Sequence, residues 1–474
     1  MKWTLLCCIV LLFTSSCNKF LDVNPAGELP AEKLLKDAAG FENAMYGVYA
    51  TMPKGSLYGA SLSNDMVEVL AQSFESFGNN YVFNLQTYNY KFSSVEAELL
   101  NTWKDMYNNI SNVNNVLKNL NNFSPQTLKY YDLYKGEALG LRAFMHFDLL
   151  RLYTEHKAGA EGIPYSKSFS LTPPDFSTAA QNYTQIITDL KEAENLLKQD
   201  QAYFTFPKVN PAEGFVKDRE IHFNLYAVQA TLARVYFTQG DLPNALIYAE
   251  KVIQSGKFQL LDKAEVASGV MKGILYPKET IFGLYSNNYF TTAKSRFYLE
   301  TSFYSYNPRK NTKAIYEKNQ VGHDYRWDAF FKLPLVPSGN IRFVKLVDPY
   351  QLEDREFQRP AQYIKGINMI RLPEMYYIAA EALLNSNPQK AREYFDKVLE
   401  SRGLIGLANQ VPAQSLTLNL ITEDRYKEFI GEGQNFFNMK RLHLDITDVY
   451  QKVIPASKEV YVLPVPLEET DYRK

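Results

Sequence analysis

The chain has 474 residues, with 51 basic and 52 acidic side chains and a formal net charge of −1. This balance gives no electrostatic basis for binding nucleic acid, which needs a concentrated basic surface, so no nucleic-acid partner is expected. Hydrophobic residues make up 46% of the chain, enough to form a core. The aromatic residues are 34 Tyr, 30 Phe and only 3 Trp. Because tyrosine joins an apolar ring to a polar hydroxyl, this composition suits a surface that stacks on a ligand and still meets water.

The first residues have the pattern of an export signal. Lys2 precedes an apolar run over residues 5–13, and the small residues 14–16 lead to Cys17. The run is too short to cross a bilayer, since roughly 30 Å of hydrocarbon takes about 20 apolar residues in a helix. We therefore expect residues 1–16 to be a signal peptide that is removed after export.

Cysteine placement favours lipid attachment at Cys17 over a plain secretory signal. Small residues directly before a cysteine resemble a bacterial lipobox, in which the new N-terminal cysteine carries acyl chains such as palmitate. Cys7, Cys8 and Cys17 are the three cysteines of the chain, so cleavage before Cys17 leaves one that cannot form an internal disulfide. Because two or more acyl chains anchor a protein stably, a lipidated Cys17 implies permanent membrane attachment.

Several segments have the apolar spacing of amphipathic helices. Residues 101–120, 136–153 and 183–197 each place apolar side chains three and four positions apart. The first segment has an Asn-rich opposite face, which we expect to be solvated. Its apolar stripe consists of Trp103, Met106, Tyr107, Ile110, Val113, Leu117 and Leu120. The second segment has a stripe of Leu139, Ala143, Phe147 and Leu150.

Two further segments have the spacing of tetratricopeptide units. Residues 228–258 place Leu232, Ala233, Tyr236, Gly240 and Ala245 at the apolar, small, aromatic, turn and small positions of such a unit. Residues 379–403 repeat the spacing of its second helix with Ala391 and Phe395. The repeats are degenerate, so the pattern predicts an irregular helical-repeat scaffold.

Two regions, about 60–92 and 260–364, lack a sustained helical period and are dense in Tyr, Phe, Asn and Ser. Long irregular connections in compact proteins are usually binding loops or disordered, and this aromatic content argues against disorder. Sugar rings stack on aromatic side chains while amides bond their hydroxyls, although any single tyrosine could equally be structural. The predicted ligand-binding residues are Tyr81, Asn84, Tyr88, Tyr285, Tyr289, Tyr298, Tyr304 and Tyr306.

The titratable residues give little support for catalysis or for a cofactor. Glu374 and Glu381 can project from the same side of one helix, but an ion pair with Arg371 or a helix cap explains them better. The spacing of Asp424, Glu428 and Glu432 equally fits a solvated helix face. The five histidines include no pair with the spacing of a zinc site. We therefore predict no catalytic residue, no metal site and no cofactor.

Six segments, in the same order along the chain, together resemble the SusD/RagB family. Each alone is only a short pattern, but the ordered set behind a lipobox is specific and spans nearly the whole mature chain. The segments are LDVNP at 21–25, the helix at 136–153, the repeat at 230–260, INMIRLPEMYYIAAEALL at 367–384, EDRYKEFIGEGQNFFNMKRLH at 423–443 and VLPVP at 462–466.

The resemblance implies a mainly α-helical single domain over residues 17–474: a tetratricopeptide-like scaffold with aromatic-rich loop insertions and little strand. It further implies a non-catalytic lipoprotein, anchored in the outer membrane and exposed at the cell surface. Such a protein captures an oligosaccharide or a peptide and delivers it to its partner, a SusC-like TonB-dependent transporter. Residues 432–441 depart from the family's E-G-x-R-x-x-D-L-K-R by lacking the arginine and the aspartate, which puts a local ion pair in doubt and not the fold.

Two other functions fit the same residues. A surface glycoside hydrolase on a helical scaffold needs two carboxylates across a cleft, about 5 to 5.5 Å apart for retention or ~6.5 to 9.5 Å for inversion. A pure assembly scaffold is the other alternative, since helical repeats often serve as one. An aromatic cleft without a carboxylate pair favours capture over hydrolysis, and ligand binding that depends on the loop tyrosines favours capture over scaffolding.

Overall fold

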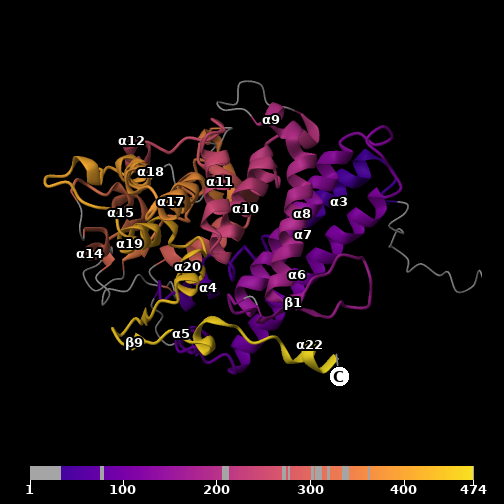
Figure 1. Cartoon of the computed structure of the whole chain (residues 1–474), viewed down its shortest axis with the longest axis horizontal. Coiled ribbons are helices and arrows are strands. Elements are labelled where there is room, and N and C mark those ends of the chain that lie inside the picture. The colour runs from indigo at the N-terminus through magenta and orange to yellow at the C-terminus, as the bar shows by residue number, and fades with distance from the viewer. Residues whose placement is uncertain are drawn as a thin grey trace, which may run out of the picture.

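The computed structural model describes residues 34–74, 80–157, 159–204, 213–268, 274–275, 278–299, 304, 312–317, 321–333, 341–360 and 363–472. The signal segment, Cys17 and Tyr306 lie outside this part of the chain. Long helices run side by side across the molecule (Figure 1). The mainly helical, repeat-like fold predicted from the sequence is confirmed.

The N-terminal half is built on three long helices. They are α6 (Ser93–Leu120), α7 (Tyr131–Tyr153) and α8 (Ala179–Leu196), with α7 packed against the other two. The predicted stripe of α6 is buried at Trp103, Met106, Ile110, Val113 and Leu120, as expected of an amphipathic helix. The expectation that its Asn-rich face is solvated was partly wrong, because the amides of Asn109, Asn114 and Asn119 are buried and donate hydrogen bonds. On α7 the predicted stripe is buried too, but so is nearly all of the remaining surface, because neighbours cover it on several sides.

Two glycines let neighbours approach α7 closely. A Cβ atom on Gly136 would lie 2.6 Å from the Leu197 side chain, and one on Gly140 would lie 2.4 Å from the ring of Phe223. A helix buried on all sides has no polar face. Its sequence therefore indicates that the segment is helical but does not indicate that the helix lies in the core.

Two helical pairs form the tetratricopeptide-like part. The first pair is α10 (Leu225–Gln239) and α11 (Leu242–Ile253), and the second is α17 (Leu372–Leu383) and α18 (Pro388–Ser401). Asn224 and Asp241 cap α10 and α11, and Gly240 between them has a φ of 82°, a left-handed conformation that favours glycine. Helix α11 packs against α17, so the two pairs stack as the repeat pattern predicts.

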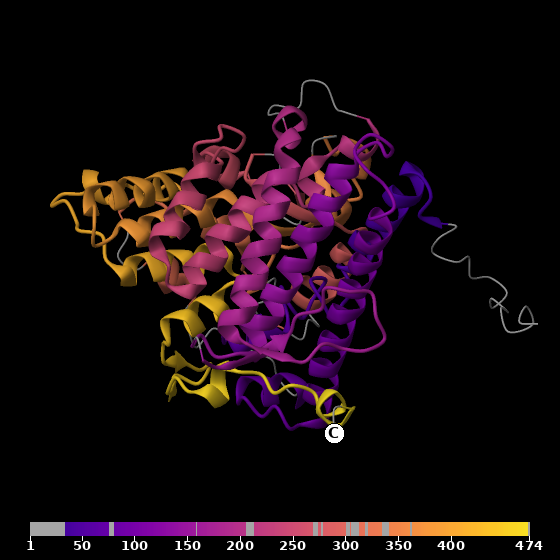
Figure 2. The same cartoon turned by 45° about the vertical axis from the view of Figure 1, so that its right-hand side comes forward.

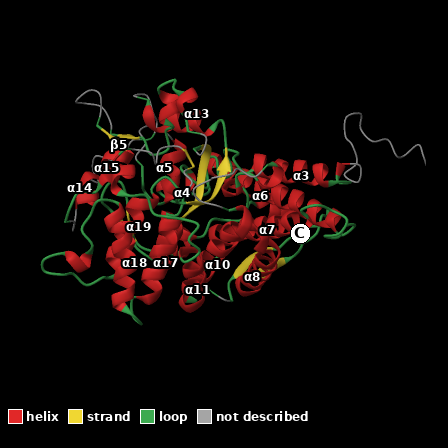
Figure 3. Ribbon diagram, turned by 90° about the horizontal axis from the view of Figure 1, so that it is seen from above, coloured by secondary structure: helices red, strands yellow, loops and turns green. Residues whose placement is uncertain are grey.

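A three-stranded antiparallel sheet lies between the helical pairs and the loop regions. Its order is β3 (Ile274–Leu275), β7 (Ile364–Arg371) and β4 (Thr280–Tyr285), with Thr280 opposite Arg371 and Tyr285 opposite Gly366. Viewed from above, α5 (Asn80–Gln86), α13 (Tyr289–Ala293) and α15 (Tyr325–Phe330) lie on the side opposite to the two helical pairs (Figure 3). The sheet therefore joins the scaffold to the insertions.

The remaining elements are short. The helices are α3 (Ala38–Thr51), α4 (Met66–Leu70), α5 (Asn80–Gln86), α9 (Asp200–Tyr203), α12 (Lys263–Ala267), α13 (Tyr289–Ala293), α14 (Thr312–Glu317), α15 (Tyr325–Phe330), α16 (Pro349–Leu352), α19 (Leu418–Phe429), α20 (Asn435–Leu442), α21 (Lys458–Tyr461) and α22 (Leu467–Tyr472). The strands are β1 (Glu161–Pro164), β2 (Phe176–Thr178), β5 (Phe331–Lys332), β6 (Arg342–Phe343), β8 (Ile446–Thr447) and β9 (Val453–Ile454). None of the described helices is long and apolar enough to cross a membrane.

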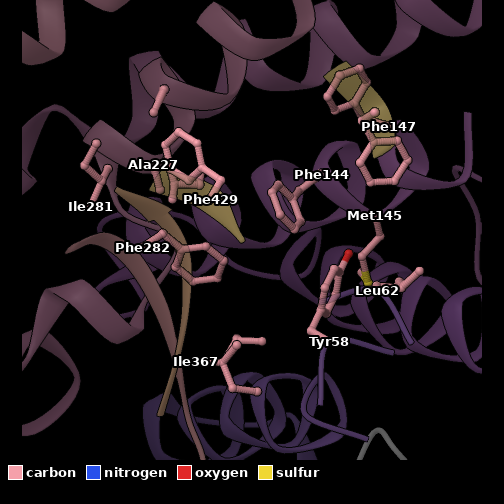
Figure 4. Close-up of a cluster of buried hydrophobic side chains, with 14 of the residues drawn as sticks. Tyr58, Leu62, Phe144, Met145, Phe147, Ala227, Ile281, Phe282, Ile367 and Phe429 are labelled. Carbon is pink, nitrogen blue, oxygen red and sulfur yellow. The ribbon is translucent and has the colours of Figure 1, made fainter. Parts of the chain in front are cut away.

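Aromatic side chains connect the helices with the sheet in the core (Figure 4). The ring centroids of Phe144 on α7, Phe223 and Phe282 on β4 are 5.1 to 5.9 Å apart. Tyr58, directly before the first loop region, packs 5.8 Å from Phe144, and its hydroxyl donates to Asp148 over 2.8 Å. The first loop region is thereby fixed to the helical scaffold.

A buried ionic network fixes the base of the second loop region. Arg371, at the end of β7, pairs with Glu279 at 3.1 Å and with Glu428 at 2.7 Å, and Arg402 contacts the same two carboxylates at 3.0 and 2.9 Å. All four side chains are fully buried. The solvated-face interpretation of Glu428 and its neighbour Asp424 was therefore wrong, because Asp424 is also buried and pairs with Arg326 at 2.6 Å.

Candidate functional site

The two aromatic-rich regions meet at a polar contact beside the sheet, which we call the junction. Asn64 precedes α4, while Tyr289 and Arg296 lie in α13 and in the five-residue π-helix that follows it, η5 (Lys294–Tyr298). The Asn64 amide nitrogen donates to the Tyr289 hydroxyl over 2.9 Å, and its oxygen accepts from Arg296 over 3.0 Å. One side chain thus joins both insertions.

Asp65 makes the second connection across the junction. It occupies the N-cap position of α4, where an aspartate normally accepts from a backbone N–H, but its side chain makes no cap. Its carboxylate instead pairs with Arg296 at 2.8 Å and accepts a hydrogen bond from the Tyr304 hydroxyl. The Arg296 side chain keeps 24% of its surface exposed, so a charged donor stays accessible at the edge of this cluster.

Aromatic rings form the floor of the junction. Phe74, from the first region, lies 4.9 Å from Phe297 and 5.8 Å from Tyr304, measured between ring centroids. Phe343 on β6 closes the group at 5.7 Å from Phe74 and 5.5 Å from Phe297. Buried aromatic pairs of this kind hold surface loops in one conformation.

Tyr81 and Glu98 border the junction on the side of α5 and α6. Burial raises the pKa of the Tyr81 hydroxyl well above its usual value, and the nearby carboxylates of Asp65 and Glu98 raise it further. Burial also raises the pKa of Glu98, which accepts a hydrogen bond from the Ser61 hydroxyl. At neutral pH the Tyr81 phenol is therefore protonated and can donate a hydrogen bond.

Two predicted tyrosines of the second region have more accessible rings. Tyr285, at the end of β4, is 49% exposed, and its hydroxyl donates to Asn287 over 2.8 Å. Tyr298, at the end of η5, is half-buried, and the guanidinium of Arg342 lies 4.9 Å from its ring centroid. Tyr289 and Tyr304 are almost completely buried, so they can contribute hydroxyl groups but little ring surface.

The other predicted ligand residues of the first region have local partners. Tyr88 has a positive φ of 56°, and its hydroxyl donates to the Leu70 carbonyl over 2.8 Å. The Asn84 amide donates to the Asn80 carbonyl and accepts from Asn89, both over 2.7 Å. Tyr306 lies outside the described residues. For all eight residues a role in binding stays a prediction.

Sequence reasoning missed Asn64, Asp65 and Arg296. The available signal was the Asn-Asp pair directly before the apolar run of α4, which resembles an ordinary helix cap. Nothing local distinguishes a capping aspartate from one directed at a residue more than two hundred positions away. Arg296 lies within the tyrosine-rich run, and nothing in the neighbouring sequence predicts its contact with the first region.

The carboxylates considered for catalysis have structural partners. Burial alone would raise the pKa of Glu374, but Arg234 at 2.6 Å and Arg425 at 3.2 Å outweigh it and lower that pKa to about 2. Glu381 pairs with Arg441 at 2.8 Å, and the expected partner Arg371 belongs to the ionic network at β7. Among the described residues, no group of three or more His, Cys, Asp or Glu side chains could hold a metal ion.

The segment that departs from the family pattern is satisfied by other bonds. Asn435 stands in place of the arginine, and its side-chain amide donates to the Tyr426 carbonyl over 3.2 Å. Asn438, in place of the aspartate, accepts from Arg441 over 3.0 Å. The neutral amides at both departing positions thus make hydrogen bonds of their own.

The fold is that of a helical-repeat protein with stacked helical pairs. Its two insertions meet in the polar and aromatic junction. Residues 19–237 match a family model described as starch-binding associating with outer membrane, and residues 280–471 match the model of the SusD family. The chain belongs to the SusD/RagB family.

Relatives match over nearly the full length of the chain. SusD-like protein P2 of Formosa agariphila is 24% identical, over 97% of this chain and 95% of that protein. A SusD superfamily protein from Bacteroides thetaiotaomicron superimposes with a TM-score of 0.73 at 22% identity, covering 92% of this chain and 98% of the other. A laminarin-binding SusD-like protein has a TM-score of 0.66 at 17% identity, with 92% and 97% covered. These structural likenesses show the fold.

Proposed function

We propose that the protein captures a glycan at the cell surface and delivers it to a SusC-like TonB-dependent transporter in the outer membrane. The observation that carries the proposal is the junction, where two insertions far apart in sequence meet through Asn64, Asp65 and Arg296. Membership of a family described as starch-binding and outer-membrane-associated supports it.

The chemistry of the junction suits a saccharide better than a strongly charged ligand. Asp65 neutralises much of the Arg296 charge at 2.8 Å, so the available groups are hydroxyls, amides and a paired guanidinium. Tyr285 and Tyr298 offer accessible ring surface beside them for the apolar C–H face of a sugar. A related protein is named as laminarin-binding, which directs the first ligand screen to neutral β-glucans, with peptides as the alternative.

The proposal includes a lipid anchor and no catalysis. An acylated Cys17 would keep the protein at the outer membrane, since no described helix could span it. At the junction the Asp65 carboxylate is occupied by Arg296 and by the Tyr304 hydroxyl, which leaves it poorly placed to act as a nucleophile or base. Capture without turnover is the function that these contacts favour.

Calorimetric titration of the acylated protein tests the capture role. Laminari-, malto- and xylo-oligosaccharides would be compared with short neutral peptides, first with the unaltered protein and then with the variant Tyr285→Ala/Tyr298→Ala. We expect saccharide binding that weakens by about tenfold or more in the variant, equivalent to ~1.4 kcal/mol. Tyr450→Ala is the matched control, because Tyr450 is 59% exposed and lies outside both loop regions.

Co-purification tests the partner. The acylated protein would be isolated from its native outer membrane and the accompanying proteins identified by mass spectrometry. A large β-barrel transporter in near-equal amount supports delivery, whereas a protein that comes down alone and binds no oligosaccharide in calorimetry contradicts the proposal.

A further inference from the structure

A groove of about 510 Å³ lies away from the junction, between α6, the segment that connects β1 with β2, and the C-terminal helix α22. Figures 1 and 2 show the C-terminal segment running beneath the long helices to reach α22. Its volume falls within the ~300 to 1,000 Å³ typical of small-molecule sites. None of the residues predicted from the sequence to bind ligand lines it.

Helix α6 itself separates the groove from the junction. At about 100° of rotation per residue, Glu98 faces one side of α6, and Leu100, Lys104 and Tyr107 face the opposite side. Glu98 contacts Ser61 of the first loop region, whereas the other three line the groove. The two surfaces therefore use different faces of one helix.

One wall of the groove is held by buried polar side chains. Asn114 donates to the Ser166 carbonyl over 3.1 Å, and Arg142 donates to the Lys167 carbonyl over 3.2 Å. Asp189 fixes that guanidinium through two bonds of 2.7 and 2.8 Å. Because these groups hold the backbone at Ser166 and Lys167, this part of the wall is preformed and a ligand would not have to order it.

His146 adds a further support to this wall. Its Nε2 accepts from the Ser166 N–H over 3.0 Å, so the proton of the neutral ring lies on Nδ1, which donates to the Arg142 carbonyl over 2.8 Å. Burial lowers the pKa of His146 to about 3. The ring is therefore neutral at physiological pH, and the wall keeps its position there.

The opposite wall and floor combine aromatic rings with hydrogen-bonding groups. Tyr107 packs 4.9 Å from Trp103, measured between centroids, and its hydroxyl donates to the Pro164 carbonyl over 2.8 Å. Trp103 donates from its indole nitrogen to Glu469 of α22 over 3.3 Å. The C-terminal helix is thereby fixed at the rim of the groove.

We propose that this groove is a second binding site, which takes a short neutral oligosaccharide. Tyr107 and the prolines of the connecting segment offer apolar surface for the C–H face of a sugar ring, and Ser111, Ser166 and Ser168 offer hydroxyls beside it. The charged lining groups are Lys104, Glu468 and Glu469, an excess of negative charge that disfavours anionic ligands. The site is independent of the proposed capture at the junction.

A pair of matched variants on α6 tests the groove. Asn108 lines it and Asn101 does not, and both are exposed on the same helix. Because helical side chains lean toward the N-terminus, Asn108→Trp fills the groove beside Lys104, whereas Asn101→Trp leans away from it. The probes are laminaritriose, cellotriose, maltotriose and xylotriose, with a proline-rich hexapeptide as the alternative, in ligand-observed NMR and calorimetry of the full acylated protein.

We expect one trisaccharide to bind in the Tyr285→Ala/Tyr298→Ala background, with about tenfold weaker affinity after Asn108→Trp and no change after Asn101→Trp. Tyr107→Phe should keep most of this binding because the ring remains, and Tyr107→Ala should lose it. Binding that survives Asn108→Trp, or binding of the peptide and of no saccharide, would overturn the proposal. Loss of the junction site alone would leave the expected effect of Asn108→Trp intact, so failure of one proposal is distinguishable from failure of the other.

Discussion

The side-chain amide of Asn64 donates a hydrogen bond of 2.9 Å to the hydroxyl of Tyr289, across 225 positions of the sequence. Both groups are buried, and the same asparagine also accepts from Arg296. A buried bond of this kind is costly to break, because the partner left behind cannot turn to water. The two insertions are therefore fixed to each other as well as to the scaffold.

Removing the Tyr289 hydroxyl should reveal this coupling. Tyr289→Phe leaves the Asn64 amide without its acceptor in a buried place, so we expect a loss of about 1 to 3 kcal/mol in the free energy of unfolding. Urea denaturation followed by circular dichroism measures it. Tyr285→Phe is the control, because the Tyr285 hydroxyl bonds to Asn287 at the exposed surface, and its loss should change stability by less than about 0.5 kcal/mol. Equal effects of the two changes on the free energy of unfolding would contradict a stabilising role of the buried Asn64–Tyr289 hydrogen bond.

Loss of the Glu428 carboxylate should strongly lower stability. It pairs with Arg371 at 2.7 Å and with Arg402 at 2.9 Å, and all three side chains are fully buried. Glu428→Ala would remove the carboxylate that both buried guanidinium groups share and leave Glu279 between them, at an expected cost of about 3 to 5 kcal/mol. Glu423→Ala, one turn earlier on α19 and half-buried, should cost far less. Similar denaturation midpoints for the two variants would show that the network contributes little.

Two glycine-to-alanine changes within helices should have opposite signs. At Gly140 on α7 the new methyl group would lie 2.4 Å from the Phe223 ring, so we expect a loss of roughly 1 to 3 kcal/mol from overpacking. At Gly47 on α3 nothing lies within 4 Å, so alanine should gain about 0.5 to 1 kcal/mol from its higher helix propensity. Thermal unfolding of both variants checks the prediction, and a stabilised Gly140→Ala would show that α7 packs less tightly.

Glu68 should make stability depend on pH. Burial raises the pKa of Glu68 from 4.5 to about 7, although its carboxylate accepts from the Gly433 N–H over 2.9 Å. Between these two pH values the folded protein holds a proton that the unfolded chain releases, so its free energy of unfolding falls as pH rises through the window. The expected loss is roughly 3 kcal/mol, fully developed above a pH of about 7.

The variant Glu68→Gln separates this group from every other titrating residue. The amide oxygen can still accept from Gly433, but no proton is released, so the fall in stability between pH 5 and 8 should be smaller by the contribution of Glu68. Urea midpoints of both proteins at the two pH values give the comparison. Parallel pH profiles would show that Glu68 keeps an ordinary pKa in the folded protein.

Membrane attachment should depend on Cys17. Cys17→Ala removes the sulfur that the lipobox pattern assigns to acylation, so the protein should no longer incorporate labelled palmitate and should leave the membrane fraction. Fractionation with metabolic labelling measures both effects. Cys8→Ala, within the apolar run of the signal, is the matched control and should leave both unchanged; a Cys17→Ala protein that stays membrane-bound would contradict the anchor.

The helices could be predicted because their evidence is local. The spacing of Trp103, Met106 and Ile110 appears within a single segment, and the Ala391 and Phe395 pattern likewise defines α18 from its own residues. Burial of whole helices could not be predicted in this way. The carboxylates of Asp424 and Glu428 have the spacing of a solvated face, and only the arrival of Arg326, Arg371 and Arg402 from other elements makes their burial possible.

The sequence indicates the two regions that form the candidate site, but it does not indicate which side chains of these regions meet. Aromatic content identified the two segments, but the meeting of Asn64 and Asp65 with Tyr289, Arg296 and Tyr304 depends on how the sheet orients both insertions. The groove beside α6 was not predicted at all. Trp103 and Tyr107 belong to an ordinary apolar stripe, and their second role arises only when the β1–β2 connection and α22 pack over them.

The antiparallel pairing of β4 with β7 has a consequence for how this protein can diversify. Tyr285 lies opposite Gly366 and the Ser286 N–H donates to the Lys365 carbonyl over 3.3 Å, so the chain between the two strands leaves and returns at neighbouring points. With both ends clamped, doubling the length of such a loop costs only about 0.6 kcal/mol in closure entropy. The exposed parts of this insertion can therefore change in length at little cost in closure entropy, while its buried residues and the two paired strands keep the frame in place.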